Sequence, residues 1–248
     1  MPTTRLGLST FDTRLIDGLE FCRKVYDLFD QTRREPVGIS KLRLRSTKNE
    51  KRLLEELIPI ARFVQARYQE GRRIKVRWFS GSQPYDAILW SSGGLVTNGM
   101  AHRRQLVEVT TSVHPDDHLS REELDKKGMS WGAKQIRRDK RTKQIESEPY
   151  VYHNEERSVD LANQILKCLH SKSAKNYPAG TVLIVNCDSE GLLLHDEWGA
   201  AVERVEQARA HLAFREVFLV ETGRGFSATL YGKRAPVVRR RARQAQAV

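Results

Sequence analysis

Two short apolar segments each contain one carboxylate at a position where a buried strand is expected to be apolar. Residues 85–90 have the sequence YDAILW, and residues 105–111 have the sequence QLVEVTT. A strand that is covered on both faces rarely holds a charge without a partner such as a metal ion. Asp86 and Glu108 are therefore the first candidates for functional residues.

Strand geometry predicts where these two carboxylates point. A period of two places Leu106, Glu108 and Thr110 on one face of the strand and Val107 and Val109 on the other. If the two segments are neighbouring strands, the carboxylates converge on one site. Two close carboxylates repel each other unless a cation lies between them, and ligation by oxygen alone suits Mg²⁺ or Mn²⁺.

Hydrophobic periodicity predicts helices that alternate with short strands. Such an order, with both hairpin-length turns and a crossover helix, indicates an α/β fold with a mixed sheet. We expect an N-terminal helical extension at 1–45, an α/β domain at 46–233 with a polar, basic excursion at about 114–156, and a basic tail at 234–248. The expected helices are 10–32, 53–68, 119–124, 131–138, one beginning near 158, and 197–212; the expected strands are 73–79, 85–90, 105–112, 181–185, 216–221 and 226–231.

The charge balance favours a polyanionic partner. The 248 residues contain 43 Lys and Arg against 31 Asp and Glu, a net charge of +12. Neutralising phosphates releases condensed counterions, so nucleic acid, with DNA ranked ahead of RNA, is the first candidate partner. Three dispersed cysteines without a CxxC pair predict a cytoplasmic setting, and no apolar window predicts a leader or a membrane partner. The sequence leaves open whether the protein forms a homodimer.

The positive charge is concentrated in two segments. Residues 121–143 contain nine Lys and Arg against four Asp and Glu, and residues 233–243 contain six with no acid. A solvated tail is an equally good interpretation of the second segment. The candidate contacts to nucleic acid are Lys134, Arg137, Arg138, Arg239, Arg240 and Arg241.

At Pro84-Tyr85-Asp86 and at Glu108, placed between the expected helix, strands and crossover helix, the chain resembles the PD-(D/E)XK nuclease superfamily. The resemblance covers about residues 48–188 and implies a restriction-endonuclease-like mixed central sheet flanked by helices. It also implies metal-dependent hydrolysis of phosphodiester bonds, with Asp86 and Glu108 as metal ligands. The Val109 carbonyl would complete the ligand set. The family's lysine, two positions after the Glu, is replaced here by Thr110.

A lysine from another element can take that place in relatives of this superfamily. Residues 161, 165, 168 and 172 follow helical spacing, so Lys172 continues the apolar stripe that faces the sheet. The alternative is a lysine that extends to solvent at the helix end, and Lys134 is a second, weaker candidate. Glu55 or Glu56 could add a ligand, although solvated helix-surface glutamates are the more common case.

Two rival interpretations remain. His114 and His118 have the spacing of a zinc or manganese pair, but Pro115 between them favours a loop. The loss of a lysine at Thr110 favours a module that binds nucleic acid or assembles with partners without catalysing a reaction, since Thr cannot offset charge on a phosphate undergoing attack.

Overall fold

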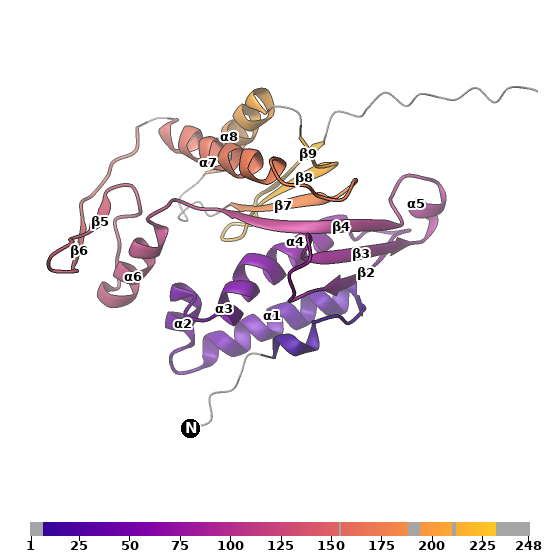
Figure 1. The fold of residues 1–248 in the computed structure, drawn as a ribbon, viewed down its shortest axis with the longest axis horizontal. Helices are drawn as coiled ribbons and strands as arrows, with labels where there is room; N and C mark the ends of the chain where they lie inside the picture. The colour runs from indigo at the N-terminus through magenta and orange to yellow at the C-terminus, as the bar shows by residue number, and fades with distance from the viewer. Residues whose placement is uncertain (1–6, 154, 188–193, 210–211, 232–248) are drawn as a thin grey trace, which may run out of the picture.

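The computed structural model describes residues 7–153, 155–187, 194–209 and 212–231, and its centre is a seven-stranded mixed sheet (Figure 1). The strands lie in the order β1-β2-β3-β4-β7-β8-β9. Neighbouring strands run antiparallel except for β4, β7 and β8, which run parallel to one another. The bounds are Ile16–Asp17 (β1), Arg73–Trp78 (β2), Ala87–Ser92 (β3), Arg104–Ser112 (β4), Val182–Cys187 (β7), Glu216–Glu221 (β8) and Ser227–Tyr231 (β9).

Helices cover the two faces of this sheet unequally (Figure 1). On one face lie α1 (Gly18–Arg34) and a continuous helical segment made of α3 (Lys48–Arg52), a π-helical stretch (Leu53–Leu57) and α4 (Ile58–Arg67). On the other face, α7 (Glu156–Ser173) and α8 (His195–Ala208) pack against β7 and β8. The general prediction of an α/β fold with a mixed sheet is confirmed.

The N-terminal helix begins later than its apolar pattern predicts. Asp17 caps α1 by accepting from the Leu19 N–H at 3.0 Å, and Leu15 and Leu19 are both 52% exposed. Gly18 lies against β2, where an added Cβ would stand 2.9 Å from the Ile74 carbonyl oxygen. The helix therefore starts where the chain leaves β1, and the predicted start at residue 10 is wrong. Its buried residues Phe21 and Val25 belong to the same core cluster as the sheet.

The excursion forms a small satellite of the main sheet. Helix α6 (Asp117–Lys127) packs on a two-stranded sheet of β5 (Ile136–Arg138) and β6 (Ile145–Ser147), and α2 (Gly38–Leu44) holds α6 through Arg43 and Asp125 at 3.1 Å. The helix predicted at 131–138 is wrong, because its last residues form the ladder of β5 instead. The remaining short helices are a 3-10 turn (Leu8–Thr10) and α5 (Gly94–Thr97).

Candidate functional site

Glu108 lies on β4, and Asp86 lies directly before β3, next to the position where Ala87 pairs with Val107 of β4. The Asp86 N–H donates to the Val107 carbonyl at 2.8 Å, and Asp86 Oδ2 accepts from the Val109 N–H at 2.7 Å. Asp86 therefore contacts both residues that flank Glu108. Alternation along β4 places Val107 and Val109 in the core under α1 and α4, so Glu108 points toward the face that carries α7.

Two side chains from the far end of α7 and the loop after it meet Glu108. Lys172 Nζ lies 2.6 Å from Glu108 Oε1, and the Tyr177 hydroxyl donates to the same oxygen at 3.1 Å. The side chains of Glu108 and Lys172 are 12% and 18% exposed. The helical stripe that predicted Lys172 facing the sheet thus places its ammonium on the predicted carboxylate.

Glu56 lies near Asp86 and comes from the π-helical stretch before α4. Its Oε2 accepts a hydrogen bond from Trp78 Nε1 at 3.0 Å, and its charge acts on Asp86. A π-helical turn contains an extra residue and therefore changes which side chains face the sheet. The periodicity of a normal α-helix therefore cannot predict that Glu56 faces this site. It cannot predict the contact of Tyr177 either, because Tyr177 lies after the end of α7.

Burial and like charges make Asp86 an unusual acid. Burial, followed by the charge of Glu108, raises the pKa of Asp86 from 3.8 to about 7, against the hydrogen bond from the Val109 N–H. Burial also raises the pKa of Glu56. Burial opposes the charged form of Lys172, but the hydrogen bond to Glu108 and the charges of Glu108, Tyr177 and Asp86 together outweigh it and raise the pKa of this ammonium. Asp86 can therefore exchange a proton near neutrality beside a lysine that stays charged.

The donor set suits a hard cation. Glu56, Asp86 and Glu108 each have one carboxylate oxygen in the contacts described above, and the other oxygen accepts no hydrogen bond from the described residues. Such oxygen ligands suit Mg²⁺ or Mn²⁺. Within the described residues, no three His, Cys, Asp or Glu side chains are already grouped closely enough to hold a metal ion. The chemistry of these oxygen ligands thus fits Mg²⁺ or Mn²⁺, whereas the described side chains are not grouped as a three-ligand site.

The neighbours of Glu108 on β4 have separate surroundings. Thr110 pairs with Val185 of β7 and is partly buried. Val109 is 7% exposed, and its N–H is the donor to Asp86. Lys172, rather than the residue at position 110, therefore brings positive charge to Glu108.

The two histidines of the other predicted metal pair lie on either side of a turn, His114 before it and His118 in the first turn of α6. His114 Nδ1 accepts from the Asp116 N–H at 3.2 Å, and His118 Nδ1 lies 3.1 Å from the Pro115 carbonyl oxygen. Both rings therefore contact the backbone of their own turn.

The predicted basic contacts in the excursion are engaged in ion pairs. Lys134 binds Glu156 and Asp160, Arg137 Nη2 lies 2.8 Å from Glu146, and Arg138 binds Glu122. Arg239, Arg240 and Arg241 lie outside the described residues. In the excursion, acids thus offset part of the positive charge that the sequence concentrates there.

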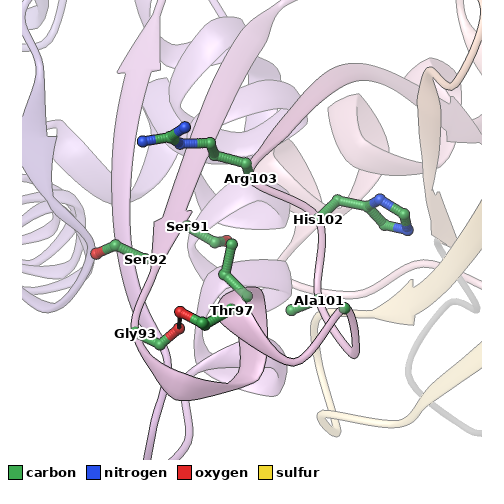
Figure 2. A pocket seen from close by; sticks show the side chains of 9 residues that line it. Ser91, Ser92, Gly93, Thr97, Ala101, His102 and Arg103 are labelled. Atoms are coloured by element: carbon green, nitrogen blue, oxygen red, sulfur yellow. Dashed lines mark hydrogen bonds between the residues drawn. The ribbon is translucent and has the colours of Figure 1, made fainter.

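Two cavities lie away from the carboxylate pair. One of about 590 Å³ is at the tip of the β3–β4 hairpin, where Figure 2 shows Ser91, Thr97, His102 and Arg103 around it. Asp86 precedes β3, so this cavity lies at the opposite end of that strand. The other, of about 720 Å³, lies between the excursion and α7, and its lining includes Lys134. Neither lining includes Asp86 or Glu108.

No protein-family model, curated protein or solved structure matches this chain. Among the described residues, no helix combines the length and the apolar character needed to cross a bilayer.

Proposed function

We propose that this protein is a metal-dependent nuclease of restriction-endonuclease-like architecture that hydrolyses phosphodiester bonds, with DNA preferred over RNA. The observation that carries the proposal is the buried contact between Lys172 and Glu108 beside Asp86. It brings together two carboxylates and one ammonium from three separate elements. Burial of such groups needs a reason, because each charge is costly to remove from water.

Each residue has a distinct role in this proposal. Asp86 and Glu108 bind Mg²⁺ or Mn²⁺, with the Val109 carbonyl in the ligand set and Glu56 as an additional carboxylate. When bound, the ion supplies an activated water and offsets charge on the scissile phosphate. Lys172 holds a positive charge where the attacked phosphate becomes more negative, and Tyr177 orients Glu108 through its hydroxyl.

A second candidate function follows from Thr110. A nuclease-like module that has lost its usual lysine binds nucleic acid or assembles with partners without cutting. In that case the ion pair between Lys172 and Glu108 has a structural role only. The net charge of +12 supports nucleic-acid binding in both candidates.

A cleavage assay distinguishes the two candidates. Purified protein is incubated with plasmid, single-stranded DNA or RNA in Mg²⁺, Mn²⁺ or EDTA, beside Asp86→Asn and a control, Asp27→Asn. Asp27 is an exposed acid on α1 that is paired with Arg23. We expect cleavage with either metal ion, none in EDTA, loss with Asp86→Asn and no change with Asp27→Asn. Binding without cleavage under every condition would support the second candidate, and equal cleavage by wild type and Asp86→Asn would overturn the proposed site.

A further inference from the structure

Strands β2 and β3, and the Arg104 end of β4, leave one face of the sheet without a helix among the described residues, whereas α7 reaches the later part of β4 through Lys172 and Glu108. The core under α7 and α8 contains side chains of β7, β8 and β9 but none of β2, β3 or β4. Figure 1 shows α7 and α8 on the β7–β9 side of this face, and α7 also reaches β4, where Lys172 contacts Glu108. Asp86 and Glu108 lie on the same side of the sheet, at the margin of the open face, because their neighbours Ala87 and Val107 point into the opposite core.

Basic and aromatic side chains lie in a row across this open face. Lys75 pairs with Trp90, and Trp90 pairs with Arg104, so the three stand side by side on adjacent strands. Arg73 lies two residues further along β2 on the same face. Lys75, Arg73 and Arg104 are exposed, and their side chains have no hydrogen-bond or ion-pair partner within the described part of the chain.

This row differs from the basic residues of the excursion. Lys134, Arg137 and Arg138 all bind acids, so part of their charge is already offset. The cations at 75 and 104 keep their full charge on either side of the half-buried indole of Trp90. An indole between two unpaired cations is suited to a ligand that combines flat rings with phosphates.

We propose that the open face of β2, β3 and β4 binds single-stranded nucleic acid, with one base stacked on Trp90 and the flanking phosphates at Lys75 and Arg104. Asp86 is four residues from Trp90 along the chain, or roughly 13 Å at the rise of a strand. The row crosses the strands, so a nucleic-acid strand bound on it reaches the two carboxylates by turning along β3. This inference rests on the proposed nuclease function, because it names single-stranded nucleic acid as the form that the nuclease cuts.

A single strand fits this face better than a duplex does. The bases of a duplex are stacked on each other, so they cannot reach an aromatic side chain without being unstacked. Unpaired bases present both ring faces, and stacking tolerates any sequence. Within the described part of the chain, the open face contains no helix that could enter a major groove, which is the usual route to base recognition in duplex DNA.

Binding is tested in EDTA, where metal-dependent cleavage cannot occur. The probe is a fluorescein-labelled oligothymidine, with a labelled duplex of the same length beside it, and fluorescence anisotropy gives Kd. Trp90→Ala should weaken binding of the single strand by about 5- to 100-fold, whereas Trp90→Phe should retain most of the affinity. Trp131→Ala is the control, since Trp131 is a 50% exposed tryptophan in the excursion.

The charge contribution is tested by salt dependence. Lys75→Ala/Arg104→Ala should reduce the slope of log Kd against log salt by about 1.4, at roughly 0.7 per phosphate of a single strand. Arg23→Ala/Lys24→Ala removes the same charge from α1 on the opposite side of the sheet and should leave the slope nearly unchanged.

The outcomes separate this inference from the proposed nuclease function. Unchanged affinity and slope in both sets of variants would overturn the inference even if the protein cleaves DNA. Tighter binding of the duplex with the same dependence on Trp90 would also overturn it. Loss of single-strand binding in Trp90→Ala supports the surface, and it does so even if wild type never cuts, in which case only the nuclease proposal fails.

Discussion

The main sheet and the excursion each contain a glutamate that binds a lysine and a tyrosine. In both, one oxygen of the glutamate accepts from a lysine ammonium and from a tyrosine hydroxyl. The sheet cluster consists of Glu108 on β4, Lys172 on α7 and Tyr177 after α7. The excursion cluster consists of Lys134, Tyr150 and Glu156. Identical contacts nevertheless give the two clusters different electrostatics.

The excursion cluster is open to water and well compensated. Lys134 Nζ also lies 2.7 Å from Asp160, and the three charged side chains are 25–38% exposed. Hydrogen bonds from Lys134 and Tyr150 lower the pKa of Glu156 to about 2. Glu156 and Asp160 therefore both bind the Lys134 ammonium, which offsets the repulsion between the two carboxylates.

The sheet cluster has an acid that its lysine does not bind. Asp86 accepts a backbone N–H rather than the Lys172 ammonium, and burial beside Glu108 raises its pKa to about 7. The comparison shows that the same type of contact accompanies opposite pKa shifts of the acids in the two clusters. Burial, together with one acid more than the lysine can neutralise, produces the shifted pKa that is typical of functional sites.

The largest expected effect comes from removing each lysine in turn. Lys172→Met keeps most of the side-chain length and deletes the charge, so it should reduce the rate of DNA cleavage by about 10²–10³-fold. Lys134→Met should leave the rate nearly unchanged, because Lys134 binds Glu156 and Asp160 instead. Initial rates with plasmid in Mg²⁺ measure both, and circular dichroism checks that each variant is folded.

A charge at the neighbouring strand position sharpens this test. Thr110 lies two residues after Glu108 on the same strand, so Thr110→Lys in the Lys172→Met background should restore part of the rate. A folded Lys172→Met protein that cuts at the wild-type rate would contradict the role of Lys172. Activity that appears only with Thr110→Lys, from an inert wild type, would favour the non-enzymatic candidate.

The next effect concerns stability and pH. Because the folded state raises the pKa of Asp86 from 3.8 to about 7, it favours the protonated acid, and this contribution to stability is lost as pH rises through that window. Asp86→Asn should therefore match wild type near pH 4 and exceed its unfolding free energy at pH 8. A shift of about three pKa units, at about 1.4 kcal/mol per unit, sets an upper limit of about 4 kcal/mol on the gain.

The excursion should show the opposite sign. The pKa of Glu156 is lowered from 4.5 to about 2, so its contribution is present above about pH 4.5 and is lost as pH falls toward 2. Glu156→Gln should therefore be less stable than wild type at pH 7 and approach it in acid. Urea unfolding of the Asp86 variant at pH 4 and 8, and of the Glu156 variant at about pH 2.5 and 7, measures the comparison, and the same sign in both would contradict it.

Much of the sheet cluster follows from local periodicity. Alternation along β4 separates Glu108 from Val107 and Val109, and the helical stripe of α7 brings Lys172 to the sheet. Strand β8 has the predicted bounds, Glu216–Glu221, because a run of buried apolar residues has only one way to pack between two helical layers. These features depend on one element at a time.

Features that depend on two elements could not be predicted in this way. Leu15 and Leu19 fit a helical stripe, yet Asp17 and Gly18 start α1 between them and leave both leucines exposed. Glu56 faces Trp78 because of a π-helical turn, which no apolar pattern indicates. Contacts of this kind are determined by how separate segments meet in the fold.

The smallest expected effect tests the two tyrosines, and it isolates burial from the contact itself. Tyr177→Phe removes the hydroxyl donated to Glu108 and keeps the ring, which packs on Phe214 with the centroids 5.0 Å apart. The loss should be about 1 kcal/mol of unfolding free energy, since a partly buried carboxylate loses one donor. Tyr150→Phe removes the equivalent donor from Glu156, where water replaces it, so its loss should be smaller. Urea unfolding at pH 7 measures the loss in both variants.

Equal losses would show that burial does not distinguish the two clusters. The difference between the pKa values of Asp86 and Glu156 would then have to come from the additional acid in the sheet cluster alone.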